Sequence, residues 1–185
     1  LELSPNLVGE SFPIHGNAFQ EQWQIKRVEG NDVCLTLQSV GPSRFRYSAQ
    51  LRYKLEGGIL SMDLDVINQA DETLPYGIGF HPWLAREEDS QLQFNAIGCW
   101  LEDSQHLPTE HVAPGSGLSS DFRESNGFPH GLLNSAYTGW DGIAELMRPQ
   151  HGLKVHVKAE DPLRCLQIYS PSVDEYFICI EPVNH

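Results

Sequence analysis

The clearest pattern along the chain is an alternation of apolar and polar positions with a period of two residues. The first alternating run has its apolar side chains at Phe45, Tyr47, Ala49, Leu51, Tyr53 and Leu55. A turn sequence, Glu56-Gly57-Gly58, follows it, and a second run then places its apolar side chains at Leu60, Met62, Leu64 and Val66. This period is typical of strands buried on one face. The two runs and the turn between them predict a long β-hairpin.

Shorter strand signals recur along the rest of the chain, and no stretch carries an apolar stripe of three helical turns. These signals cover residues 33–40, 91–100, 153–158, 163–169 and 176–180. Pro182 removes a ladder donor, so we expect the last strand to end there. The segment 102–137 is polar and rich in Pro, Gly and Ser, which favours a long connection that builds a binding surface, with disorder as the alternative. The sequence predicts an all-β fold, an antiparallel β-sandwich.

Length and charge narrow the class of protein. The 185 residues predict a single domain over residues 1–185. The formal net charge is −13, with no basic stretch to follow a phosphate backbone, so nucleic-acid and membrane partners are disfavoured. The four cysteines form no C-x-x-C pair. We interpret them as small buried apolar residues of a protein in a reducing compartment. Residues 1–9 carry no export signal, and we expect a cytoplasmic protein.

Three short segments contain candidate chemistry. His15 lies in the loop sequence Phe-Pro-Ile-His-Gly, and His81 follows two glycines and precedes Pro82. Glu181 ends a run of four apolar residues. Each of these residues, taken alone, is more often structural than catalytic. Together they supply an acid and a base that work near neutral pH.

These segments carry a resemblance to a known family. The loop Ile14-His15-Gly16, the signature from Asn68 to Trp83 with its H-P pair, and the terminal Ile180-Glu181-Pro182 occur in the order and spacing of the aldose 1-epimerase (galactose mutarotase) family. The D-F-R segment at 121–123 and the turn Gly139-Trp140-Asp141-Gly142 fit the same pattern. The sequence therefore resembles an aldose 1-epimerase through most of its length.

The resemblance implies a fold and a mechanism. The fold would be a β-sandwich of the galactose mutarotase type with an open sugar cleft. His81 would protonate the ring oxygen of a free aldohexose, and Glu181 would take the proton of the anomeric hydroxyl. His15 would assist the acid and hold sugar oxygens, and Asp141 would bind ring hydroxyls. This chemistry uses no cofactor and no metal.

The resemblance also implies that the chain is shorter than its family. Family chains continue at both ends, with an N-terminal segment that usually supplies a substrate-binding arginine and further strands after the E-P motif. The sequence is therefore expected to be a fragment, the ordered part of a longer protein, or a reduced relative.

Three other functions stay open. A carbohydrate-binding module would keep the sandwich and the cleft without turnover. A hexose-6-phosphate mutarotase would need a cluster of arginines, for which Arg44, Arg46 and Arg52 are candidates. A metal site could use the pairs His106 with His111 or His151 with His156, but an offset of five puts the members of a pair on opposite faces of a strand.

Overall fold

The computed structural model describes residues 3–117, 119–172 and 174–185. It divides into two compact units, Leu1–Tyr76 and Gly77–His185. The described residues form antiparallel strands throughout, with one 3-10 turn, η1 (Pro149–His151), and no α-helix. The prediction of an all-β antiparallel fold is confirmed, while the single domain over 1–185 stays a prediction.

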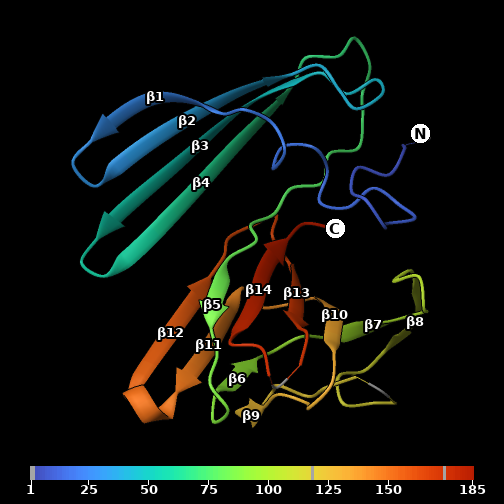
Figure 1. The fold of residues 1–185 in the computed structure, drawn as a ribbon, viewed down its shortest axis with the longest axis vertical. Helices are drawn as coiled ribbons and strands as arrows, with labels where there is room; N and C mark the ends of the chain where they lie inside the picture. Colours follow the sequence, from blue (N-terminus) through green and yellow to red (C-terminus); the bar gives the residue numbers. More distant parts are fainter. Residues whose placement is uncertain (1–2, 118, 173) are drawn as a thin grey trace. The chain divides into compact units, whose positions relative to one another are not determined.

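The first unit is a sheet of four antiparallel strands that follow one another in chain order (Figure 1). The strands are β1 (Gln24–Glu29), β2 (Asp32–Ser39), β3 (Tyr47–Glu56) and β4 (Ile59–Asn68). β3 and β4 form the predicted hairpin, with Leu51 opposite Leu64. Gly57 and Gly58 take φ values of +58° and +81°, which a tight two-residue hairpin turn requires and glycine adopts without strain.

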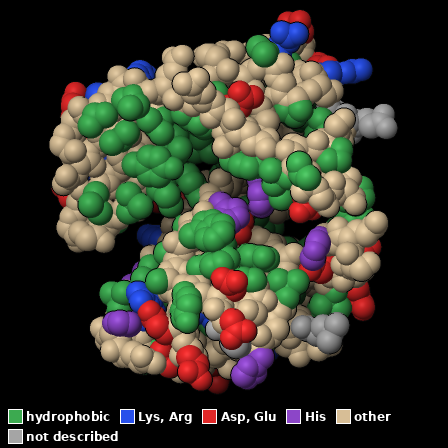
Figure 2. Space-filling model, in the orientation of Figure 1, with side chains coloured by type: hydrophobic (Ala, Val, Ile, Leu, Met, Phe, Trp, Pro, Cys, Tyr) green, Lys and Arg blue, Asp and Glu red, His purple; other side chains and the backbone are tan. Residues whose placement is uncertain are grey.

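One face of this sheet is apolar, as the alternation predicts. Leu37, Tyr47 and Ala49 are buried on it together. The same face is exposed elsewhere on the sheet, where Ile25 on the edge strand β1 and Leu60 next to the hairpin turn keep 70% and 54% of their surface open. Figure 2 shows the hydrophobic side chains gathered over the four strands.

The second unit is a sandwich of two antiparallel sheets (Figure 1). The strand order is β5-β14-β13-β10-β7-β8 in the larger sheet and β12-β11-β6-β9 in the smaller one. The larger sheet contains β5 (Trp83–Ala85), β14 (Phe177–Val183), β13 (Cys165–Ser170), β10 (Leu133–Thr138), β7 (Gly98–Glu102) and β8 (Pro108–Val112). The smaller sheet contains β12 (Leu153–Lys158), β11 (Ile143–Arg148), β6 (Gln91–Phe94) and β9 (Asn126–Gly127).

A single core fills the space between the two sheets, as in other sandwiches. Leu92 and Leu146 enter it from the smaller sheet, and Tyr137, Ile168 and Ile180 enter it from the larger one. All five are fully buried. Each of these strands therefore gives one face to the core and leaves the alternate positions for the opposite face of its sheet.

Two strand predictions needed correction. The run 91–100 is split into β6 and β7, which belong to different sheets, because the residues between them make the crossing. There the backbone oxygen of Asn95 accepts a hydrogen bond from the Asp141 amide at 3.3 Å, and the Ile97 amide donates to Thr138 at 2.9 Å. The last strand continues through Pro182 to Val183. It can do so because the Pro182 oxygen still accepts a hydrogen bond, from the Phe80 amide at 3.0 Å.

The polar segment 102–137 is more ordered than an irregular connection. It contains β8, β9 and most of β10. The side chain of Phe122, in its D-F-R sequence, is 1% exposed and belongs to the core. The described residues also contain no helix that could span a bilayer.

Candidate active site

Glu181 is a carboxylate on a rigid, buried strand. It lies in β14, which pairs with β13 on one side and β5 on the other. Ile180 points into the core, so Glu181, the next residue, projects from the opposite face of the sheet. Its side chain is 8% exposed. This burial disfavours the charged form and raises the pKa of Glu181 from its ordinary 4.5 to about 7.

His81 lies against Glu181. Its Nε2 atom is 3.4 Å from Oε1 of Glu181, and about a third of its side chain is exposed. The imidazole stacks on the indole of Trp83 with ring centroids 5.9 Å apart, and Trp83 stacks on Phe177 of β14 at 4.2 Å. The aromatic stack therefore holds the histidine at the edge of the strand that carries the carboxylate.

The backbone before His81 is fixed to the end of β14. The Phe80 amide donates to the Pro182 oxygen at 3.0 Å, and the Ile78 amide donates to Oδ1 of Asn184 at 2.8 Å. Gly79 forms a bridge with Val183. A Cβ atom at Gly79 would lie 2.5 Å from Cγ1 of Val183, closer than atoms pack. The glycine of the G-x-H-P sequence therefore allows the close approach that brings His81 to Glu181.

His15 belongs to the first unit. Its φ of +58° is left-handed, an uncommon conformation for histidine. Asn6 holds the loop around it, because its Nδ2 donates to the oxygens of Ile14 and Gly16 at 2.9 and 2.6 Å and its Oδ1 accepts from the Ile14 amide. The ring of His15 meets Phe19 edge to face at 5.8 Å. Its predicted place beside the acid and the base stays a prediction.

Asp141 lies in the exposed turn between β10 and β11. Its Oδ1 accepts a hydrogen bond from the Ile143 amide, and its Oδ2 accepts one from Nδ2 of Asn95, both at 3.1 Å. The carboxylate thus stabilises its own turn, as aspartates commonly do. Its predicted role in binding sugar hydroxyls stays a prediction.

A hollow of about 390 Å³ lies on the same face of the larger sheet as Glu181. Gln167, which lines it, stands directly opposite Glu181 on β13. Gln167 donates to Oδ1 of Asn134 at 2.6 Å, and Asn134 donates to Oε2 of Glu102 at 2.9 Å. His106 in turn is 3.0 Å from Oε1 of Glu102. A row of amide, carboxylate and imidazole groups therefore begins beside Glu181 and follows the floor of the hollow.

Sequence reasoning missed Gln167 and Asn134. The sequence carries one signal for Gln167: it is a polar residue in a predicted strand, and both of its neighbours, Leu166 and Ile168, are apolar. Both leucine and isoleucine enter the core, so the residue between them must face the other side. The lining of the hollow also includes Trp100, Leu101, Pro108, Ala136, Thr138, Cys165 and His185.

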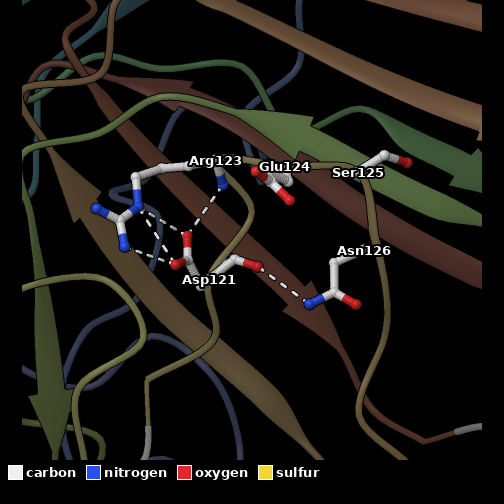
Figure 3. A pocket seen from close by; sticks show the side chains of 5 residues that line it. All are labelled: Asp121, Arg123, Glu124, Ser125 and Asn126. Atoms are coloured by element: carbon white, nitrogen blue, oxygen red, sulfur yellow. Dashed lines mark hydrogen bonds and ion pairs between the residues drawn. The ribbon is translucent and has the colours of Figure 1, made fainter.

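A second hollow, of about 620 Å³, lies along one loop and contains no acid and base pair (Figure 3). The Asp121 carboxylate accepts hydrogen bonds from Nε and an amino nitrogen of Arg123, at 2.9 and 2.6 Å. This pairing lowers the pKa of Asp121 to about 2. Both charges are therefore satisfied locally. The lining residues are Asp121, Arg123, Glu124, Ser125 and Asn126.

Two of the three candidate arginines, and the histidines of the proposed metal pairs, contact other side chains. Arg44 lies 3.4 Å from Glu72, and Arg52 pairs with Asp32. Of the histidine pairs, His106 contacts Glu102 while His111 is 2.7 Å from the Thr138 hydroxyl. His151 and His156 contact different carboxylates, those of Glu87 and Glu145. The two histidines of each H-x4-H pair therefore contact different side chains.

Comparison with known proteins identifies relatives of the whole chain. The family model described as aldose 1-epimerase matches residues 2–184. The uncharacterized protein YphB of Escherichia coli K12 is 28% identical over 190 residues, covering 100% of this chain and 65% of YphB. The chain therefore spans about two thirds of the length of this relative.

Solved structures agree with the fold. A crystal structure of a candidate aldose 1-epimerase from Escherichia coli K12 is 27% identical with a TM-score of 0.92, covering 100% of this chain and 65% of that one. A galactose mutarotase-like protein from Clostridium acetobutylicum is 20% identical with a TM-score of 0.76, covering 92% of this chain and 58% of its own. The latter likeness supports the fold alone.

Proposed function

We propose that this chain, which belongs to the aldose 1-epimerase family, interconverts the α and β anomers of a free aldohexose such as glucose or galactose. The observation that carries the proposal is the His81 and Glu181 pair, an imidazole 3.4 Å from a buried carboxylate. Opening a cyclic hemiacetal delivers one proton and removes another at two oxygens bonded to the same carbon. The acid and the base must therefore lie within a few ångströms of each other.

In the proposed reaction His81 donates a proton to the ring oxygen while Glu181 takes the proton of the anomeric hydroxyl. The bond between C1 and the ring oxygen breaks, and C1 becomes the carbonyl carbon of the open aldehyde. Rotation about the C1–C2 bond presents the other face of the carbonyl. In closure the ring hydroxyl returns its proton to His81 as it attacks C1, and Glu181 protonates the carbonyl oxygen, so both groups end as they began.

The environment of Glu181 supports its role as the base. A carboxyl group with a pKa of about 7 holds an abstracted proton better than an exposed one and is still ionised in part at neutral pH. The row of Gln167, Asn134 and Glu102 supplies donors and acceptors for the remaining hydroxyls. His15 and Asp141 belong to the proposal as further sugar-binding residues, and the four free cysteines support a reducing, cytoplasmic setting.

Polarimetry of freshly dissolved α-glucose and α-galactose, with and without the protein, tests the proposal. The protein should accelerate the approach to the equilibrium rotation for at least one of the sugars. Glu181→Gln and His81→Asn should each slow it by about 10²- to 10⁴-fold, the usual contribution of a positioned acid or base.

The matched control is Glu145→Gln, which replaces a carboxylate that is bound by Lys154 on the smaller sheet. This variant should keep the parent rate. Binding of either sugar by a parent protein that accelerates neither would reject the enzyme and favour the carbohydrate-binding module.

A further inference from the structure

Three ligating side chains converge at the candidate active site. A ring nitrogen of His81, Sγ of Cys179 and a carboxylate oxygen of Glu181 all lie within 4.8 Å of one another. No other group of three histidine, cysteine or acidic side chains comes together in this way among the described residues. The proposed sugar reaction uses the histidine and the glutamate but leaves the thiol without a function.

The placement of Cys179 follows from the strand. Ile178 and Ile180 belong to the core cluster, and Cys179, between them, faces the side of the sheet that carries Glu181. Cys99 is also fully buried, but it is a member of the core cluster, whereas Cys179 is not. The thiol and the carboxylate are therefore held two residues apart on one rigid strand, a preorganised pair of ligands.

The third ligand completes a set that suits zinc. Zinc binds thiolate, imidazole and carboxylate at about 2.0 to 2.3 Å with tetrahedral geometry, which places its ligand atoms about 3.3 to 3.8 Å apart. Nε2 of His81 and Oε1 of Glu181, 3.4 Å apart, already have this separation. Sγ of Cys179 must approach them by no more than about 1.5 Å, within reach of a side-chain adjustment. Three protein ligands leave the fourth position open, and the exposed part of His81 gives access to it.

We propose that His81, Cys179 and Glu181 bind Zn²⁺, and that the bound ion inhibits the sugar reaction by occupying its acid and its base. On binding, the thiol of Cys179 gives its proton to solvent and a zinc–sulfur bond forms, with no change in oxidation state. A soft thiolate favours Zn²⁺ over Mg²⁺ or Ca²⁺. The inhibition rests on the proposed function, whereas the metal site does not.

Cobalt provides a direct test of the site, because Co²⁺ occupies zinc sites and its bond to a thiolate gives a charge-transfer absorption band. Titration of the parent with Co²⁺ should produce this band at one equivalent, and Zn²⁺ should abolish it. Cys179→Ala should remove the band and weaken Zn²⁺ binding at least about 100-fold, since even outer-shell changes cost 10- to 100-fold. Cys99→Ala, the matched buried cysteine, should bind as the parent does.

His81→Asn is a second variant, and the loss of its imidazole ligand should weaken Co²⁺ binding at least about 100-fold, so that no band forms at one equivalent. The side chain of His81 is partly exposed, so we expect this variant to fold. It can therefore test the site even if Cys179→Ala fails to fold. A band that forms at one equivalent of Co²⁺ in either folded variant, or Co²⁺ binding to the parent without any band, would overturn the metal site.

Polarimetry then separates the metal site from the proposed function. Zn²⁺ should inhibit the parent over the concentrations at which it displaces Co²⁺, and Cys179→Ala should stay active while needing at least about 100-fold more Zn²⁺. An active parent that Zn²⁺ does not inhibit would refute the proposed inhibition. A parent that shows the cobalt band but accelerates neither sugar would contradict the proposed function and leave the metal site standing.

Discussion

Replacing Glu181 by glutamine should stabilise the protein at alkaline pH while it removes the proposed base. The folded chain buries this carboxyl group and raises its pKa from 4.5 to about 7, so folding at high pH includes the cost of burying a charge. Glutamine has nearly the same shape and carries no charge. The substitution therefore removes that cost and keeps the packing.

The size and the sign of the effect follow from the two pKa values. The folded state holds the proton more tightly than the unfolded chain, so the free energy of unfolding falls as pH rises from about 4.5 to about 7. A rise of about 2.5 in the pKa, at about 1.36 kcal/mol per pKa unit, amounts to about 3.4 kcal/mol well above pH 7. Glu181→Gln should thus be more stable than the parent by up to about 3 kcal/mol at pH 8, and nearly equal to it at pH 4.5.

Urea unfolding at pH 4.5, 6, 7 and 8 measures the difference, and hydrogen exchange of the β14 amides reports on the unit that contains Glu181. Glu145→Gln is the control with the opposite sign, because a hydrogen bond from Lys154 lowers the pKa of Glu145 and its charge stabilises the folded state at neutral pH. Equal stability of Glu181→Gln and the parent at pH 8, or the same pH dependence in both, would refute the claim that the folded state desolvates Glu181.

Three further changes test how the site is held and how it binds. Gly79→Ala should destabilise the protein by about 1 to 3 kcal/mol and slow mutarotation, because the new Cβ would lie 2.5 Å from Val183; Gly131→Ala, which meets nothing within 4 Å, should leave urea unfolding unchanged. Ile180→Val should cost about 0.5 to 1.5 kcal/mol in urea unfolding with little change in rate. Gln167→Ala should raise KM in polarimetric kinetics more than it lowers kcat, and the reverse split would contradict a binding role.

Local patterning predicts much of the fold. The alternation from Phe45 to Val66 and the two glycines between its runs predict the hairpin of β3 and β4, because burial of one face and a turn of positive φ are both properties of short segments. The break between β6 and β7 was not predictable in this way. Residues 95–97 join strands of two different sheets, and only their long-range partners distinguish them from a continuous strand.

The candidate site, too, has features that local sequence predicts and features that depend on long-range pairing. The apolar run before Glu181 predicts a carboxylate carried by a strand, but its burial depends on β5 and β13, which lie beside β14. His81 reaches Glu181 through the pairing of residues 78–80 with the chain end, a long-range register that no local spacing encodes. The family resemblance identified His81 and Glu181 as a pair, and the structure gives the distance between their side chains.

Alternate residues of β14 face the core and the candidate site, so one strand carries residues that stabilise the fold and residues proposed to do the chemistry. Ile178 and Ile180 fill the core, whereas Cys179 and Glu181 face the site. The core residues fix the strand, and the fixed strand keeps Glu181 under protein atoms where its pKa rises. Changes at the core positions should therefore alter the free energy of unfolding first, and changes at the site positions should alter proton transfer and metal binding first. Among these four positions of β14, Glu181 is the one at which a change should alter both the free energy of unfolding and proton transfer. The desolvation that suits Glu181 as a base also destabilises the folded state.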